Sequence, residues 1–119
     1  MKPYKSIFEE SFEKVDKDKK YHIIAISNAS TVSKRDTYFL GFKSEKNADL
    51  AEEYFNKASY SKPIGVDNYG FSTLEEALNY FGKSGHYNIV AYTVKNTDKM
   101  IRSNPNDLAK QVYDKIKIR

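Results

Sequence analysis

The stretch Tyr21-His22-Ile23-Ile24-Ala25-Ile26-Ser27-Asn28 decides the fold class of this chain of 119 residues. Its apolar residues occupy both odd and even positions, and successive side chains of a strand point to opposite faces of a sheet. A strand with apolar side chains on both faces is stable only when both faces are covered. The stretch therefore predicts a strand that is buried from two sides.

Two further segments have the composition of strands. Residues 37–42, which are rich in aromatic side chains, follow residues 21–28 after an eight-residue polar connection, and this favours an antiparallel hairpin. Residues 87–94 again carry apolar side chains at both parities. Short strands at 64–66 and 100–101 are weaker predictions, so the expected sheet has three to five strands.

Helices are expected where apolar residues recur every three or four positions. The third helix is predicted to begin at a capping box formed by Ser72 and Glu75. The last helix is predicted to begin with Asn104 as its N-cap and Pro105 at its first helical position. The expected helices cover residues 4–15, 45–58, 73–82 and a C-terminal segment from residue 105.

Residues 1–119 are expected to form a single compact α+β domain, because this length is typical of one domain. A small antiparallel or mixed sheet of three to five strands is packed by about four helices, in the order α-β-β-α-(β)-α-β-(β)-α. Residues 59–71, which contain Pro63, Gly65 and Gly70, are expected to form a long connection between the second and third helices.

Two segments share a pattern in which Gly-Phe ends a strand and the next helix carries Ala-x-x-Tyr-Phe-x-Lys. Gly41-Phe42 begins the first of them and Gly70-Phe71 begins the second. The pattern predicts that each Phe packs beneath the helix that follows it. It also predicts that each Tyr-Phe pair turns one ring inward and one hydroxyl outward. Duplication and convergent packing both explain the likeness.

The composition restricts the chemistry that is open to the chain. It contains no cysteine, which excludes disulfides, thiolate nucleophiles and zinc–thiolate sites. It has neither a glycine-rich phosphate loop nor a Gly-x-Ser-x-Gly segment. We therefore expect no cofactor, no metal site and no catalysis. A small enzyme that uses His22 or His86, the only two histidines, is the least favoured alternative.

The sequence also argues against a membrane-bound or secreted protein. Its longest apolar runs span a few residues, far short of the roughly 20 residues that a transmembrane helix needs. The acidic residues Glu9, Glu10 and Glu13 interrupt the segment in which a secretory signal needs an apolar stretch. We expect a cytoplasmic protein that makes no contact with membranes.

The net charge of +4 comes from the end of the chain, where residues 95–119 hold seven basic and three acidic side chains. Basic side chains neutralise phosphates, so a nucleic-acid-binding domain is the main alternative interpretation. Such a domain would use the Lys34-Arg35 loop of the first hairpin and the basic C-terminal helix. The candidate residues for nucleic-acid contact are Lys34, Arg35, Arg102, Lys110, Lys115, Lys117 and Arg119.

The favoured interpretation is a small non-catalytic protein that binds another macromolecule. The partner is expected to be a protein, which the chain regulates or inhibits as small proteins of phages and mobile elements do. Ten tyrosines support this, because tyrosine is enriched at the energetically important positions of protein interfaces. Long connections inside compact domains are frequently functional, so residues 59–71 and the C-terminal helix are the expected contact surfaces. The candidate partner-binding residues are Tyr60, Lys62, Tyr69, Lys110 and Lys117.

Overall fold

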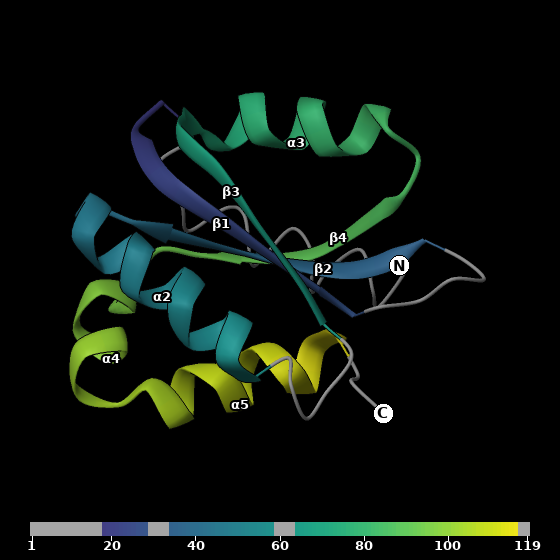
Figure 1. The fold of residues 1–119 in the computed structure, drawn as a ribbon. Coiled ribbons are helices and arrows are strands. Elements are labelled where there is room, and N and C mark those ends of the chain that lie inside the picture. Colours follow the sequence, from purple (N-terminus) through teal and green to yellow (C-terminus); the bar gives the residue numbers. More distant parts are fainter. Residues whose placement is uncertain (1–17, 29–33, 59–63, 117–119) are drawn as a thin grey trace, which may run out of the picture.

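Four strands and four helices make up the part of the chain that the computed structural model describes, which is residues 18–28, 34–58 and 64–116. Figure 1 shows a sheet with helices on both sides, which confirms the expected α+β class with a mixed sheet. The predicted helix at 4–15 lies outside the described residues. The elements are β1 (Lys20–Asn28), β2 (Arg35–Phe42), α2 (Glu45–Ala58), β3 (Ile64–Thr73), α3 (Leu74–Lys83), β4 (Tyr87–Thr93), α4 (Thr97–Ser103) and α5 (Pro105–Ile116).

The sheet has the strand order β3-β1-β2-β4, so β1 and β2 occupy its centre. β1 pairs antiparallel with both β2 and β3, whereas β2 and β4 pair in parallel. The predicted hairpin of β1 and β2 is therefore confirmed. The central place of β1 agrees with its composition, because Ile24 and Ile26 are buried on one face of the sheet while Ile23 and Ala25 are buried on the other.

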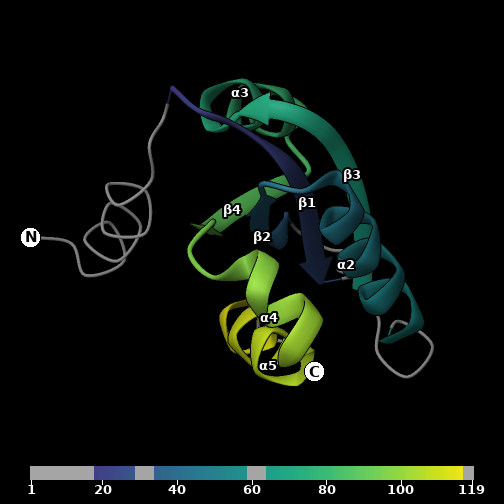
Figure 2. The same ribbon diagram turned by 90° about the vertical axis from the view of Figure 1, so that its left-hand side faces the viewer.

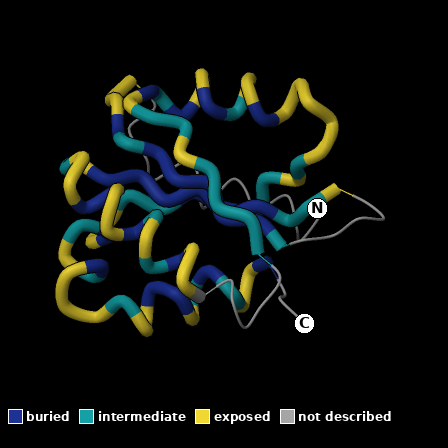
Figure 3. The backbone as a smooth tube through the Cα atoms, in the orientation of Figure 1, coloured by how far each residue is buried: buried dark blue, intermediate teal, exposed yellow. Residues whose placement is uncertain are grey.

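The two faces of the sheet are covered unequally (Figure 2). α2, α4 and α5 pack on the three-helix face, to whose core they contribute Phe55, Ile101 and Leu108. α3 packs on the opposite face, the α3 face, to whose core it contributes Leu74 and Phe81. Within the described ranges α3 is the only helix on that side. Figure 3 shows that exposed residues follow the outer sides of the helices, while the central strands are buried.

Residues 64–71 are not part of the long connection that the proline and glycine content of 59–71 predicts, and residues 59–63 lie outside the described residues. Residues from Ile64 onward form β3, an edge strand of ten residues that pairs with β1. Glycine weakens a strand locally, but pairing with the buried strand β1 outweighs this preference. Gly70 is accommodated by an irregularity in the strand, where it adopts a φ of +94°. The short strand predicted at 64–66 is the beginning of this longer one.

The short strand predicted at 100–101 is wrong, because these residues belong to helix α4. Asn96 adopts a left-handed conformation with a φ of 62°, which redirects the chain after β4. Thr97 and Ile101, which are one helical turn apart, are both buried. The Thr97 hydroxyl also donates a hydrogen bond to the carbonyl oxygen of Gly41 at 2.6 Å. Burial of one helical stripe thus outweighs the strand propensity of this short apolar run.

The N-cap of α3 lies one residue later than the sequence pattern predicts. The Thr73 hydroxyl accepts a hydrogen bond from the backbone N–H of Glu76, and the Glu76 carboxylate accepts one from the backbone N–H of Thr73, each at 3.2 Å. Ser72, the predicted cap, is instead buried in β3. Hydrogen bonds from the backbone and the hydroxyl of Thr73 lower the pKa of Glu76, so this carboxylate is ionised at neutral pH.

The two Gly-Phe segments pack differently. Phe42 is buried beneath α2 as predicted, whereas Phe71 is 60% exposed and lies against His22, with the two ring centroids 4.9 Å apart. Phe71 pairs with His22 on the three-helix face, but the helix that follows it, α3, packs on the other face. The prediction is therefore wrong for Phe71. The rest of the pattern holds, because Phe55 and Phe81 are buried while the tyrosine before each of them is not.

Tyr92 of β4 carries a buried hydroxyl that has no hydrogen-bond partner among the described residues. Burial raises the pKa of Tyr92 far above its ordinary value of 10.0, so the hydroxyl stays neutral. Because an unpartnered buried polar group costs roughly 1–3 kcal/mol, we expect Tyr92→Phe to raise the free energy of unfolding by about 1 kcal/mol. Urea denaturation measures the change. A decrease of similar size would show that the hydroxyl makes a stabilising contact.

Candidate binding pocket between β3, α3 and β4

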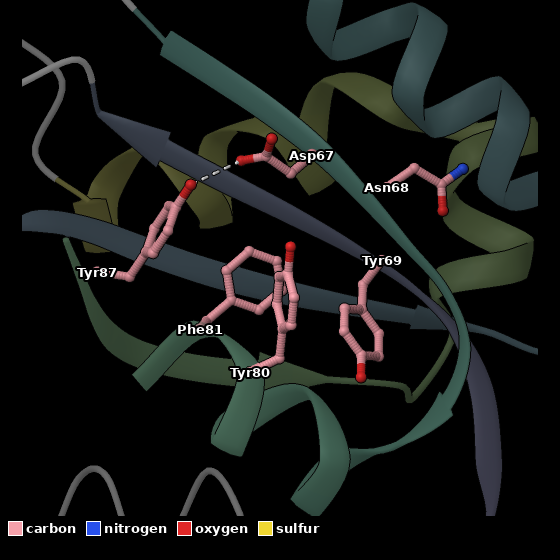
Figure 4. A pocket seen from close by; sticks show the side chains of 6 residues that line it. All are labelled: Asp67, Asn68, Tyr69, Tyr80, Phe81 and Tyr87. Carbon is pink, nitrogen blue, oxygen red and sulfur yellow. Dashed lines mark hydrogen bonds between the residues drawn. The ribbon is translucent and has the colours of Figure 1, made fainter. Parts of the chain in front are cut away.

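A pocket of about 310 Å³ opens on the α3 face of the sheet (Figure 4). Its walls come from β3, from the second half of α3 and from the start of β4. The volume lies at the lower end of the range of about 300–1,000 Å³ that is typical of small-molecule sites, which suits one side chain or a small organic group. The pocket is lined by Asp67, Asn68, Tyr69, Tyr80, Phe81 and Tyr87.

A bulge in β3 places Tyr69 in the pocket. The register with β1 shifts at this point, and Tyr69 is the extra residue that has no partner in β1. The Asn68 side chain accepts a hydrogen bond from the backbone N–H of Gly70 at 2.9 Å, and the positive φ of Gly70 completes the local turn. Bulges commonly re-aim a side chain at the edge of a sheet, and this one directs Tyr69 toward α3.

Four aromatic rings pack against one another at steep angles around the pocket. The ring centroids of Tyr69 and Tyr80 are 5.1 Å apart with their planes at 55°, and those of Phe81 and Tyr87 are 4.9 Å apart at 89°. The Phe81 ring contacts both Tyr69, at a centroid distance of 5.7 Å, and Tyr87, and Figure 4 shows these rings side by side. Phe81 is 2% exposed, whereas Tyr80 is 64% exposed. The pocket therefore has a buried aromatic base and an aromatic rim that is open to solvent.

Asp67 borders the pocket on the β3 side. Its carboxylate oxygen Oδ2 accepts a hydrogen bond from the Tyr87 hydroxyl at 3.3 Å, and Figure 4 shows this contact. Burial raises the pKa of Tyr87, and the charge and hydrogen bond of Asp67 raise it further, whereas Arg35 lowers it. Tyr87 therefore stays protonated at neutral pH and acts as a hydrogen-bond donor.

Helix α3 is held in place by contacts with β3 and by its capping box, and this keeps Tyr80 at the rim of the pocket. Tyr80 precedes the buried Phe81 by one position, and successive side chains of a helix point about 100° apart. The Tyr69 hydroxyl donates a hydrogen bond of 3.5 Å to the carbonyl oxygen of Glu76, which links the bulge of β3 to the helix. The capping box at Glu76 fixes the start of α3, so both ends of this link are anchored.

One of the five residues predicted to bind a partner lies in this pocket. Tyr69 lines it, although from a strand and not from the long connection that was expected. Lys110 is exposed on α5, and that helix packs on the opposite face of the sheet. Tyr60, Lys62 and Lys117 lie outside the described residues.

The basic residues of the nucleic-acid interpretation occupy separate places. Lys34 directly precedes β2, whereas Arg35 is the first residue of this strand and does not lie in the predicted loop. The Arg35 guanidinium is beside Gly65 of β3. Arg102 instead donates a hydrogen bond of 3.5 Å to the Asn47 side chain in the first turn of α2. α2 begins just after β2 ends, so Arg102 lies near the end of β2 and Arg35 lies at its start. At the rise per residue of a strand, the two ends of β2 are about 23 Å apart.

The outer side of α5 carries charges of both signs. The exposed residues Asp107 and Asp114 alternate with the exposed residues Lys110 and Lys115, so these four side chains have no net charge. A dense basic surface, which is the usual sign of nucleic-acid binding, is absent from this described part of the helix. The remaining candidates, Lys117 and Arg119, lie outside the described residues.

The two histidines are not brought together. His22 pairs with Phe42 at one end of β2, while His86 directly precedes Tyr87, which pairs with Arg35 at the other end. At the rise per residue of a strand, these ends are about 23 Å apart. Within the described ranges, no group of three or more His, Asp or Glu side chains is placed to hold a metal ion.

Sequence reasoning singled out Tyr69 and missed the other residues of the pocket. Asp67 and Asn68 lie in a segment whose glycine and proline content predicts a connection, although it forms β3. Tyr87 is the first residue of β4, and the sequence does not show that β4 pairs with β2. Its place in the pocket depends on this pairing. The sequence does contain a signal for Tyr80, because this residue falls outside the apolar stripe of its helix.

Comparison with protein-family models, with curated proteins and with solved structures finds no match to this chain. In the part of the chain that the structure describes, no helix is both long and apolar enough to cross a bilayer. The function is therefore inferred from the chemistry and geometry of the pocket.

Proposed function

We propose that this chain is a small non-catalytic protein that binds a protein partner through the pocket on the α3 face and thereby regulates or inhibits it. The observation that carries the proposal is the 64% exposure of Tyr80 beside a pocket that three further aromatic rings line. Large exposed apolar groups next to a concave surface are typical of interaction sites.

The chemistry of the rim supports a protein contact. Tyrosine offers a large rigid surface together with a hydroxyl that bonds to polar groups, and it is enriched at the strongest contacts of protein interfaces. Tyr69, Tyr80 and Tyr87 all line the pocket. Because Tyr69 packs on Tyr80 and Tyr87 packs on Phe81, the rings are ordered before binding, which lowers the entropic cost of association.

Strand β3 supplies a second element at the same place. It is an edge strand, so its outer backbone groups are not paired with another strand of the sheet. Extended peptides commonly bind by adding a strand to such an edge, with alternate side chains entering neighbouring pockets. A partner segment that lies along β3 would reach the pocket through Tyr69.

A pull-down from native cells tests the proposal, with immobilised wild-type protein, Tyr80→Ala and Lys110→Glu as the three baits. Each bait is used with and without nuclease. Tyr80 and Lys110 are both exposed, so both variants are expected to fold, and thermal unfolding checks this. We expect a protein that wild type and Lys110→Glu retain, that Tyr80→Ala retains at least about tenfold less, and that nuclease does not release.

Two results would contradict the proposal. One is equal retention of every captured protein by Tyr80→Ala and wild type. The other is capture that nuclease abolishes and that Lys110→Glu weakens, which would favour the nucleic-acid interpretation instead.

A further inference from the structure

The walls of the pocket are mostly aromatic rings. The faces of such rings carry negative potential and their edges positive potential, so a cation within about 6 Å of a ring centroid is attracted. Tyr69 and Tyr80 are inclined at 55° to each other, and Phe81 and Tyr87 at 89°. Tyr80 is 64% exposed, so its ring is open to a ligand at the mouth of the pocket. A cation that packs on the face of this ring is attracted to it, whereas an anion is not.

Asp67 adds a full negative charge to these walls. Its side chain accepts a hydrogen bond from the Tyr87 hydroxyl, and no Lys or Arg side chain of the described residues forms an ion pair with it. An ionised carboxylate offers about four acceptor positions, so one tyrosine hydroxyl leaves most of them for a ligand or for water. The carboxylate is thus available to pair with a cation that enters the pocket.

The charge of Arg35 affects the pKa of Tyr87, but the Arg35 side chain does not occupy the pocket. Its guanidinium lies beside Gly65, where Nη1 is 3.8 Å from the position that a Cβ would take, and it does not line the pocket. At the Tyr87 hydroxyl the charge of Asp67 has the larger effect on the pKa, and the opposing effect of Arg35 is smaller. At Tyr87 the positive charge of Arg35 therefore offsets only part of the effect of Asp67.

A further carboxylate, that of Glu76, lies on α3. Its capping box holds it one helical turn before Tyr80, and the hydrogen bonds from Thr73 lower its pKa, to which the charge of Lys20 also contributes. Lys83, in the last turn of α3, provides one positive charge on the same helix. Glu76 and Lys83 carry one charge of each sign, so the charge that lines the pocket itself is that of Asp67.

We propose that the pocket receives the side chain of a lysine or arginine of the protein partner. This rests on the proposed function, because it names the group of the partner that the pocket holds. The volume of about 310 Å³ suits one such side chain. Its methylene stem packs on the rings of Tyr69 and Tyr80, and its charged head lies between Asp67 and the ring of Tyr87.

Titration of the full chain with small cations tests this inference. The probes are n-butylammonium and n-butylguanidinium, which reproduce the two side chains, with 1-butanol as the neutral control and butyrate as the anionic control. Amide chemical shifts of ¹⁵N-labelled protein report binding at Asp67, Tyr80 and Tyr87. We expect saturable shifts with a millimolar dissociation constant for both cations, at least about fivefold weaker binding of 1-butanol, and no binding of butyrate. Added salt weakens the binding of the cations.

Three variants assign the effect to the pocket. Asp67→Asn keeps the size of the side chain and removes its charge, so we expect about fivefold weaker binding of butylammonium and unchanged binding of 1-butanol. Tyr80→Leu keeps an apolar group and removes the ring face, with an expected weakening of about two- to fivefold. Glu53→Gln makes the same carboxylate-to-amide change in an exposed pair with Lys57 on α2 and should leave the affinity unaltered.

The inference is wrong if 1-butanol or butyrate binds as tightly as butylammonium, or if Asp67→Asn leaves the affinity for butylammonium unaltered. These results are separate from the test of the proposed function. Capture of a protein that depends on Tyr80, without preference for cations, contradicts the inference alone. Binding of cations in the pocket, without a protein whose capture depends on Tyr80, supports the cation site and contradicts the proposed function.

Discussion

Gly41→Ala is expected to lower the free energy of unfolding by about 3 kcal/mol. A Cβ atom at this position of β2 would lie 2.5 Å from Val94 Cγ1, 2.6 Å from the Tyr92 hydroxyl oxygen and 2.9 Å from Tyr92 Cε1. Tyr92 is 1% exposed, so its ring has no space into which to move. Urea denaturation followed by circular dichroism measures the change.

Gly65→Ala is the matched control, because Gly65 also lies in a strand of the same sheet. The nearest atom to a Cβ there is Arg35 Nη1 at 3.8 Å, which is an ordinary contact. We expect a change within about 0.5 kcal/mol, since alanine restricts the unfolded chain without strain in the folded one. An equal loss at both glycines would show that crowding is not the cause. Tyr92→Phe in the Gly41→Ala background should restore part of the stability, because it removes one of the crowded atoms.

Asp98→Ala is expected to cost about 2–3 kcal/mol, because this side chain of α4 binds the backbone that leads into α2 and one side chain of the first turn of α2. Its carboxylate accepts hydrogen bonds from the backbone N–H of Lys43 at 3.0 Å, from the backbone N–H of Ser44 at 3.1 Å and from the Asn47 side chain at 2.8 Å. Alanine would leave all three donors without this acceptor. Chemical denaturation at neutral pH measures the loss.

Glu45→Ala is the control for the loss of a negative charge at the start of α2. Glu45 is exposed in the first turn, and the structure records no hydrogen bond of its side chain within the described residues. Its contribution is limited to the attraction between a carboxylate and the positive end of the helix dipole. We expect a cost of about 0.3–1 kcal/mol. Equal losses for Glu45→Ala and Asp98→Ala would show that the hydrogen bonds of Asp98 add no stability.

The contribution of Asp98 should also depend on pH. Burial raises the pKa of Asp98, but the hydrogen bonds from Asn47, Lys43 and Ser44 together outweigh burial and hold the pKa below its ordinary value of 3.8. A carboxyl group whose pKa is lowered by folding stabilises the protein above its unfolded pKa, and this is lost as the pH falls through the folded pKa. The difference in unfolding free energy between wild type and Asp98→Ala should therefore stay constant above about pH 5 and shrink below about pH 4. A constant difference in acid would contradict this assignment.

Elements whose local pattern agrees with their packing are predictable from the sequence. Helix α2 spans Glu45–Ala58, the range that the apolar spacing predicts. Strand β1 is central because apolar side chains occupy both of its faces. In each case the same residues determine both the local conformation and the buried contacts, so one pattern is enough.

Elements that depend on a distant partner are not predictable in this way. β3 contains two glycines and is a strand because β1 needs a neighbour on that side. Ser72 and Thr73 are each followed three residues later by a glutamate, so the sequence cannot distinguish between two capping boxes. The pocket is harder still, because Asp67 and Tyr87 lie on strands at opposite edges of the sheet and meet only through their side chains.

Strand β3 follows β1, β2 and α2 in the chain, and this order has a consequence for biosynthesis. β1, β2 and α2 leave the ribosome before β3 is made, yet β1 lies between β2 and β3 in the finished sheet. Until then the nascent chain presents a strand rich in isoleucine with one open edge, which is a template for association with another chain. A β3 strand donated by a second molecule satisfies that edge equally well. Refolding at high concentration should therefore yield exchanged dimers, and slow dilution should favour monomers.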